Sequence, residues 1–163
     1  MLIDIDIRNA EERDVNLLAD LSRFVHDIHV TALPAYFKPF DPGAIAESFR
    51  SRLQHPEVRA CIASVGAVPV GYAVVVLRER KEDARCLPRR FYEVDEIAVS
   101  PAHRQKGVAR ALIEHVLREA RSLGIHGLEL TSWSFNAPAH AAFEALGFSP
   151  MVVRFRRECD EHE

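Results

Sequence analysis

The chain has few of the residues that mark several common protein classes. It holds three cysteines among 163 residues, and their odd number and wide spacing predict neither a disulfide framework nor a zinc site. No apolar run approaches the length of a membrane span, and no Gly-x-Gly-x-x-Gly or Gly-Lys-Ser/Thr segment is present. We therefore expect neither a membrane protein nor a nucleotide-binding protein of Rossmann or P-loop type.

An excess of positive charge is also missing. The net charge of −3 argues against the broad basic field that many nucleic-acid binders use. Hydrophobic residues make up 48% and charged residues 28%, which is ordinary globular composition in a chain long enough to bury a core. The first residues alternate and do not form a charged-then-apolar leader. We expect a single cytoplasmic domain over residues 1–163, with no nucleic-acid or membrane partner.

Hydrophobic periodicity predicts a mixed α+β fold. The strands are expected at residues 2–8, 58–65, 70–77, 91–100, 126–132 and 148–157. The helices are expected after an N-cap at Asp14 and at residues 42–54, 104–123 and 136–146, with a charged, solvated loop at 78–90. The order is β-α-α-β-β-β-α-β-α-β, in which the β-α-β unit must place its two strands parallel.

The most informative segment passes from the expected central strand through a turn into a helix. The turn reads Arg104-Gln105-Lys106-Gly107-Val108-Ala109, and Gly107 and Ala109 leave no bulk over the first helical turn. N–H groups at a helix start lack internal partners and the helix dipole adds positive charge there, so the segment predicts a phosphate or pyrophosphate site. Lys106 and Arg110 either add charge to this site or form an ordinary solvated face.

A second segment, further along the chain, opens a helix with Asn136-Ala137-Pro138-Ala139 and ends it with Ala145-Leu146-Gly147-Phe148. In this order the two segments resemble the GCN5-related N-acetyltransferase (GNAT) family over about residues 60–157, with the first sixty residues similar only in layout. The resemblance implies a mostly antiparallel sheet whose two central parallel strands splay apart around the thioester arm of acetyl-CoA. It also implies acetyl transfer to a primary amine of a small molecule or peptide, and a possible homodimer through the last strand.

The resemblance implies coenzyme-binding residues on the central strand, the turn and the last helix. They are Ile97, Ala98, Val99, Arg104, Gln105, Lys106, Gly107, Val108, Ala109, Arg110, Asn136 and Phe143. Phe143 stands where many relatives carry a tyrosine that protonates the leaving thiolate. Water, His140 or Tyr92 are alternative proton donors, and a coenzyme-A-binding sensor or interaction module with little turnover is the alternative function.

Acetyl transfer also requires a base, because a lysine-like amine has a pKa of about 10.4 and its deprotonation at neutral pH costs about 4–5 kcal/mol. Strand alternation predicts Glu93 and Asp95 on one face of the central strand and Glu96 on the other. Glu93 and Asp95 match positions where family members carry the base, so we expect Glu93 first and Asp95 second. Pairing with an arginine of the 78–90 loop is the structural alternative for each, and Glu129 is a weaker candidate.

The resemblance places the acceptor amine against the first helix and the loop that follows it. The residues of this region that we expect to bind the acceptor are His26, His29, Tyr36 and Phe37. The two histidines are three positions apart and therefore neighbours on one helix face, where an ordinary partly buried helix edge is an equally consistent reading. No third ligand is evident beside them, so no metal site is expected.

Overall fold

The computed structural model describes residues 4–159 and forms two compact units, Met1–Thr131 and Ser132–Glu163. The first unit contains the sheet and the helices α1, α2 and α3, and the second contains the helix α4. Element order follows the prediction up to α4. Between residues 4 and 159, no helix combines the length and the apolar character that crossing a bilayer requires.

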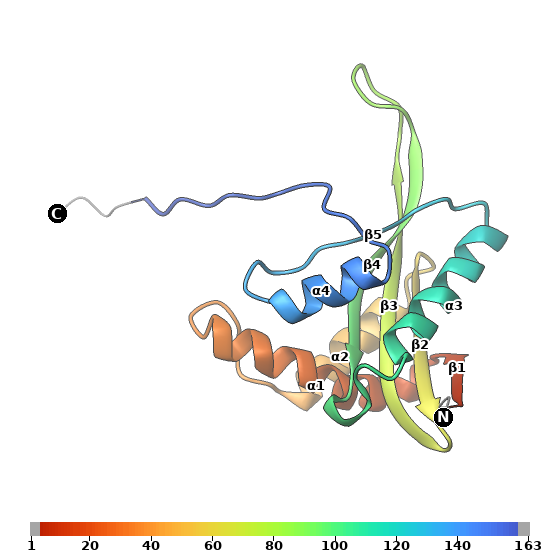
Figure 1. Ribbon diagram of the computed structural model, residues 1–163, viewed down its shortest axis with the longest axis vertical. Coiled ribbons are helices and arrows are strands. Elements are labelled where there is room, and N and C mark those ends of the chain that lie inside the picture. Colours follow the sequence, from red (N-terminus) through yellow and green to blue (C-terminus); the bar gives the residue numbers. More distant parts are fainter. Residues whose placement is uncertain (1–3, 160–163) are drawn as a thin grey trace. The chain divides into compact units, whose positions relative to one another are not determined.

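The sheet has the order β1-β2-β3-β4-β5, with each strand beside its neighbour in the chain. The strands are β1 (Ile5–Asn9), β2 (Val58–Val65), β3 (Val68–Arg80), β4 (Arg89–Val99) and β5 (Leu128–Leu130). The pairs from β1 to β4 are antiparallel, whereas β5 runs parallel to β4 (Figure 1). This confirms the mixed α+β prediction and the parallel β-α-β unit. The residues of the expected first strand that precede position 4 lie outside the described residues.

Of the three helices in the first unit, the first two begin at the expected signals, with one difference in chemistry. The helices are α1 (Val15–Ala32), α2 (Pro42–Leu53) and α3 (Val108–Ser122). Asp41 caps α2, because its carboxylate accepts from Ala44 N at 3.0 Å. Asp14 is the N-cap residue of α1, as predicted, but its side chain does not cap the helix. Its carboxylate makes no cap bond and instead accepts from both Arg8 Nη atoms, at 2.7 and 2.8 Å, and from Glu11 N.

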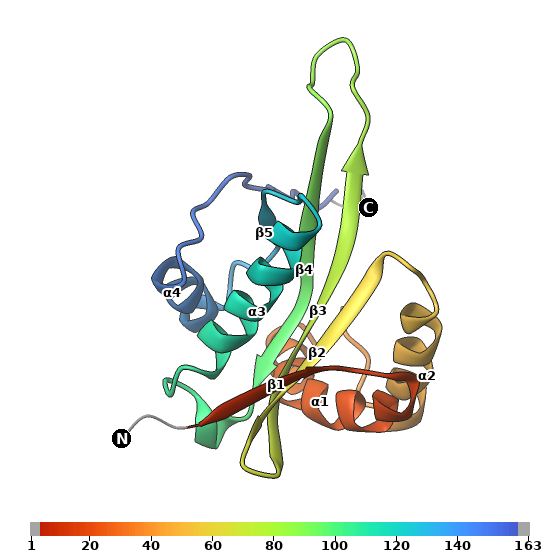
Figure 2. The same cartoon turned by 90° about the vertical axis from the view of Figure 1, so that its right-hand side faces the viewer.

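Alternating side chains give the sheet two cores. One face packs against α1 and α2 through a cluster that includes Leu18, Phe49 and Tyr72. The other face packs against α3, whose Leu112 and Val116 are fully buried. Figure 2 shows α3 on one side of the strands and α1 with α2 on the other.

The expected 78–90 loop is wrong in its extent. β3 and β4 continue as a two-stranded ribbon, pairing as far as Arg80 with Arg89, and only residues 81–88 are outside the strands (Figure 2). Cross-strand ion pairs explain why so charged a sequence stays extended: Arg90 Nε lies 2.8 Å from Glu79 Oε1. So charged a segment predicts a loop because it lacks the apolar side of a buried strand.

Two further element boundaries and one whole strand differ from the prediction. α3 begins at Val108 and not at Arg104, because a 3-10 turn (Pro101–His103) and a looser turn precede it. β5 is shorter than the expected strand at 126–132. In the second unit, α4 (Ala137–Ala145) forms as predicted, but the strand expected at 148–157 is absent from the described chain. That segment carries exposed apolar side chains at Met151, Val152, Val153 and Phe155.

Candidate active site

The turn before α3 has the backbone of an anion site. Gln105 and Gly107 both have positive φ, 59° and 87°, and Gly107 is the N-cap of α3 with no side-chain cap bond. Left-handed residues alternating with ordinary ones turn successive N–H groups to the same side, which makes a concavity that binds anions. Residues 104–107 are exposed, which leaves this turn open to a ligand.

Several contacts tie this turn to the end of β4. Arg104 Nε donates to the Val99 carbonyl at 3.1 Å, and Ser100 Oγ lies 2.8 Å from His103 Nδ1. Gly71 lets both α3 and β4 approach closely, because a Cβ there would lie 3.2 Å from Val108 Cγ1 and 2.9 Å from the Ala98 carbonyl oxygen. The turn is therefore held in a defined position relative to the central strand.

β4 has neighbours on both sides for only part of its length. Its pairing with β5 runs from Tyr92 to Val94, whereas its pairing with β3 continues to Val99. Ser100 N donates to Val70 O at 2.7 Å, and antiparallel residues alternate between facing the partner strand and turning away. By this alternation the backbone groups of Ile97 and Val99 turn away from β3, toward the side where the β5 ladder has ended. The two parallel strands thus share pairing only at one end.

A β-bulge corrects the prediction for the three carboxylates of β4. Val74 pairs with Glu96 while Val75 pairs with Val94, so Asp95 is an extra residue in the ladder. Glu93 lies opposite Val76 and Glu96 opposite Val74, and both partners belong to the core on the α1/α2 face. The alternation that separated Glu96 from Glu93 is therefore wrong, because the inserted residue returns Glu96 to the face that Glu93 occupies.

Each acidic candidate is paired with an arginine. Arg78 Nε donates to Glu93 at 2.5 Å, as the structural alternative anticipated. Asp95 pairs with Arg52 on α2, also at 2.5 Å, and not with the 78–90 segment. Glu129 pairs with Arg89.

Glu96 has two partners, of which the sequence indicated neither. Arg52 donates to one of its carboxylate oxygens, and the Tyr72 hydroxyl donates to the other at 2.6 Å. Burial chiefly, and then the nearby Glu96 carboxylate, hold the pKa of Tyr72 well above its usual range. In the sequence, the only indication of a functional role for Tyr72 is its hydroxyl within the apolar run of β3. Nothing in the sequence indicates a role for Arg52.

The expected acceptor residues form an aromatic group at the C-terminal part of α1. His29 stacks on Phe37 with ring centroids 5.0 Å apart, and the Tyr36 ring contacts Phe37 at the same distance. His26 Nε2 lies 2.8 Å from the Lys38 carbonyl, which fastens the loop to the helix. Burial lowers the pKa of His29, His26 lowers it further, and Glu96 opposes the shift. The structure thus brings His29, Phe37 and Tyr36 together, while His26 holds the loop.

In the second unit, the two residues predicted to bind the coenzyme, Asn136 and Phe143, belong to α4 and its N-cap. Asn136 caps the helix by accepting from Ala139 N at 3.3 Å. The Phe143 ring packs edge-on against Phe148, with centroids 6.0 Å apart. The ring of His140, one of the alternative proton donors, lies 3.0 Å from the Trp133 carbonyl through Nε2. Tyr92, the other alternative, is buried in the first unit.

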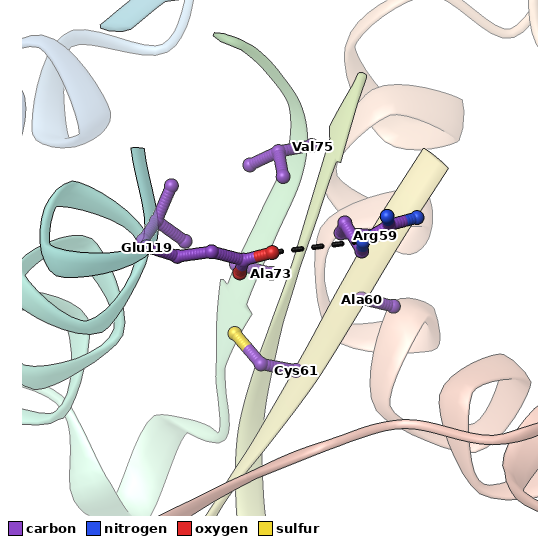
Figure 3. Close-up of a pocket in the computed structure, with 7 residues that line it drawn as sticks. Arg59, Ala60, Cys61, Ala73, Val75 and Glu119 are labelled. Carbon is purple, nitrogen blue, oxygen red and sulfur yellow. Dashed lines mark ion pairs between the residues drawn. The ribbon is translucent and has the colours of Figure 1, made fainter. Parts of the chain in front are cut away.

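Neither the hollow beneath α3 nor the acidic, histidine and cysteine side chains of the described chain form a further ligand site. A hollow between β2, β3 and α3, shown in Figure 3, is lined by Cys61, Val116 and the Arg59–Glu119 ion pair, among others, and has no room for a water molecule. No group of three or more His, Cys, Asp or Glu side chains within residues 4–159 is arranged to hold a metal ion.

The central strand, whose parallel partner ends early, leads directly into a turn with two left-handed residues at the start of α3. Residues 25–148 match the model of the acetyltransferase (GNAT) family, which covers most of the chain. The chain therefore belongs to the GNAT family. This confirms the family resemblance and the expected class of acetyltransferase.

Curated relatives match a shorter stretch. The chain is 40% identical over 58 residues to the [ribosomal protein bS18]-alanine N-acetyltransferase of Escherichia coli (strain K12), which is 36% of this chain and 39% of that enzyme. It is 39% identical over 56 residues to the streptothricin acetyltransferase of Streptomyces lavendulae, which is 34% of this chain and 30% of that enzyme. The match thus spans well under half the length of either relative.

Solved structures share the fold over nearly the whole chain. A tetramutant of the BH1408 protein from Bacillus halodurans has a TM-score of 0.89 at 19% identity, covering 94% of this chain and 99% of that one. An aminoglycoside N-acetyltransferase in complex with CoA has a TM-score of 0.71 at 22% identity, covering 98% of each chain. These likenesses confirm the fold class.

Proposed function

We propose that this protein is an acetyl-CoA-dependent N-acetyltransferase in which a bound primary amine attacks the thioester directly. The observation that carries the proposal is the turn before α3, with left-handed Gln105 and Gly107, at the end of a strand whose parallel partner has already ended. The turn suits a pyrophosphate, and the unpaired side of the strand suits the extended arm of the coenzyme. Acetyl-CoA supplies the activated acetyl group as a co-substrate.

The residues of the turn have distinct proposed roles. The backbone N–H groups from Gln105 to Ala109 hold the pyrophosphate, and Lys106 and Arg110 add positive charge beside it. Ile97, Ala98 and Val99 line the arm, and an N–H of this stretch donates to the thioester oxygen, where a fixed donor stabilises the charge that develops. Asn136 and Phe143 on α4 are coenzyme-binding residues by the family pattern alone, and this stays a prediction. Arg104 keeps the turn attached to β4.

The proposed acceptor is a primary amine, on either a small molecule or a peptide. Relatives named for this chemistry act on an alanine of a ribosomal protein and on streptothricin, which span both options. In this chain the aromatic group of Tyr36, Phe37 and His29 offers an apolar wall for the acceptor, while carboxylates on β4 offer a partner for its charge. His26 acts indirectly, through the loop that it fastens.

The base is proposed to be a carboxylate of β4. Glu93 and Asp95 are the residues that the family pattern favours, and each would have to share or release its arginine to accept a proton. Replacing each by its amide tests the assignment. Loss of rate with unchanged coenzyme affinity identifies the base, and an unaffected rate in both removes Glu93 and Asp95 from the role.

The missing hydroxyl at Phe143 favours a second candidate function. Without a tyrosine there, the leaving thiolate takes its proton from water, which is mildly demanding because a free thiol has a pKa of about 8.5. A coenzyme-A-binding sensor or interaction module with little turnover fits the same residue. The two functions differ in turnover and not in binding.

Calorimetric titration with acetyl-CoA and thiol release over a panel of amines separate these proposals. Binding together with sustained thiol release supports the enzyme, whereas binding without release supports the sensor. No heat of binding at hundreds of micromolar acetyl-CoA contradicts both. Aminoglycosides, streptothricin-like amines and peptides with N-terminal alanine belong in the panel, alongside simple polyamines.

We also propose a cytoplasmic location and a homodimer. Cys61, Cys86 and Cys159 are free thiols, which suits a reducing compartment. The exposed apolar side chains at 151–155 provide surface that a second copy would cover. Light scattering after size exclusion tests the dimer, and a monomer mass at tens of micromolar would contradict it.

A further inference from the structure

Three arginines share one face of the ribbon that the ends of β3 and β4 form. In β3, Arg78 and Arg80 follow Val76 at even spacings, so alternation turns all three side chains to the same face. Arg89 joins them from β4, because it lies directly opposite Arg80. Val76 belongs to the core against α1 and α2, which identifies this as the α1/α2 face of the sheet. The ribbon, which extends past the helices in Figure 2, thus continues that face as a row of cations.

The opposite face of the ribbon is balanced in charge. Glu79 lies opposite Arg90, and the two side chains form an ion pair. Opposite charges that face each other across two strands stabilise the pair of strands, whereas like charges directly opposite destabilise it. The facing Arg80 and Arg89 therefore destabilise the ribbon, unless an anion lies near both side chains.

Carboxylates of the described chain pair with only two of the three arginines. Arg78 Nε lies 2.5 Å from Glu93 Oε2. Arg89 pairs with Glu129 on β5. Arg80 is exposed and has no ion-pair partner within residues 4–159. This face of the ribbon therefore has room and charge for one further anion.

The turn at the tip of the ribbon does not supply that anion. Asp83 interacts electrostatically with Arg80, but no oxygen of its carboxylate lies within ion-pair distance of the guanidinium. Its Oδ1 atom instead accepts from Arg85 N and Cys86 N, at 2.8 Å each. These bonds hold the turn in a defined conformation and keep the carboxylate occupied there.

The row of arginines leads along β4 toward the proposed site of acetyl transfer. The aromatic group proposed to hold the acceptor belongs to α1 and the loop after it, and α1 packs on this same face. At about 3.3 Å per residue, Arg89 lies roughly 25 Å along the strand from Ile97, which is proposed to line the thioester arm. A small amine does not span that distance, whereas an extended peptide of about eight residues does. Resting on the proposed acetyl transfer, we infer that the acceptor is a peptide amine and that Arg80, with Arg89 beside it, binds an acidic side chain about six to nine residues from that amine.

A peptide fits this surface better than a nucleic acid. Residues 78–90 contain no aromatic side chain on which a base could stack, and the Arg89 guanidinium lies over the Phe91 ring, 4.3 Å from its centroid. The whole chain also has a net charge of −3, which disfavours a polyanion. Both edges of the ribbon are open, since β3 pairs with β2 only as far as Val76 and β4 pairs with β5 only from Tyr92. An extended peptide can hydrogen-bond along such an edge.

The test compares two peptides with a free N-terminal alanine that differ at positions six to nine, where one carries glutamate and the other glutamine. Fluorescence anisotropy of a C-terminal label gives their Kd values, and thiol release from acetyl-CoA gives kcat and KM. Arg80→Gln removes the charge and Arg80→Glu reverses it. Arg90→Gln is the matched control, because it removes an arginine from the opposite face of the same ribbon.

The wild type should bind the glutamate peptide about 5–20-fold more tightly than the glutamine peptide at low salt, and about 0.5 M salt should remove most of this preference. Arg80→Gln should reduce the preference about 2–5-fold, and Arg80→Glu should abolish it. Both effects should appear in KM and not in kcat, because the contact is remote from the reacting atoms and is the same in the ground state and the transition state. Arg90→Gln should keep the wild-type preference.

Equal affinity of the wild type for both peptides, or a preference that Arg80→Glu leaves unchanged, would overturn the inference. The second result would mean that a charge of either sign only keeps the ribbon edges from associating. Tighter binding of a single-stranded RNA than of the glutamate peptide would also overturn it, as would turnover of small amines alone. In all these cases the acetyl transfer stands. A wild type that acetylates no amine would overturn the proposed function and the role of the peptide as acceptor, while the two affinities still decide whether Arg80 binds acidic side chains.

Discussion

The same strands build two different faces. The face against α3 is mainly apolar, with Leu112 and Val116 buried over it and one ion pair, Arg59–Glu119, at 3.6 Å. The face against α1 and α2 also has an apolar core, but it adds the hydrogen-bonded Tyr72–Glu96–Arg52 network. One face therefore supports the helix that carries the proposed anion-binding turn, and the other orients ionised side chains. The bulge at Asp95 assigns Glu96 to the second face.

The largest expected effect is the loss of stability caused by a cavity on either face of the sheet. Leu112→Ala and Leu18→Ala each remove a side chain with 0% exposure, so each should lower the free energy of unfolding by about 2–5 kcal/mol in urea titrations. Only Leu112→Ala should also weaken acetyl-CoA binding, because Leu112 holds α3 and its N-terminal turn. Equal loss of coenzyme affinity in Leu18→Ala would show that the two faces do not act separately.

A smaller effect is expected at the turn itself. Gly107→Ala places a side chain at φ +87°, which costs about 1–2 kcal/mol, so a shift of the turn should weaken acetyl-CoA binding by about 5–30-fold in calorimetry. Gly124→Ala is the matched control, because Gly124 follows the other end of α3 with φ +69°. It should lose similar stability and keep the wild-type Kd. A weakened Kd in both variants would indicate a general effect on α3.

Local chemistry explains what the sequence could predict. Asp41-Pro42 and Asn136 mark helix starts through their caps, and Gly107 marks the turn through its backbone freedom. These signals depend on residues close together in the chain. The same is true of the β-rich composition that predicted β2 and the centre of β3.

Features that depend on a distant partner could not be predicted. The bulge at Asp95 arises from how β4 pairs with β3, and the segment around it contains no glycine that would mark it. Arg52 reaches carboxylates more than forty residues away. The segment 148–157 was predicted to be the last strand, but a strand requires a neighbouring edge, which no pattern within the segment supplies.

The ion pair between Arg8 and Asp14, at the start of α1, predicts how acid affects the stability of the protein. The Arg8 hydrogen bonds hold the pKa of the buried Asp14 below its usual range, against the opposing effect of burial. A lowered folded pKa means that this stabilisation is present above the unfolded pKa of about 3.9 and is lost as the pH falls through the folded value. Asp14→Asn should therefore cost about 1–2 kcal/mol at pH 7 and much less near pH 2.

Urea unfolding at the two pH values measures this difference. Asp27→Asn is its control, since the exposed Asp27–Arg23 pair at 3.4 Å should contribute well under about 1 kcal/mol at either pH. A pH-independent cost of Asp14→Asn would mean that the shape of the side chain, and not its charge, stabilises the start of α1.

The smallest effect concerns the face against α3, where the reactivity of the Cys61 thiol should show whether water reaches the sheet. Burial raises the pKa of Cys61 to about 12, so at pH 8 roughly one molecule in ten thousand carries the reactive thiolate. Iodoacetamide at pH 8 should label the exposed Cys159 and the partly exposed Cys86 while leaving Cys61 unmodified, with no change in stability. Labelling in urea, followed by mass spectrometry, gives the control in which all three react. Native labelling of Cys61 at the rate of Cys159 would show that water reaches the sheet beneath α3, and the contrast between the two faces would then be lost.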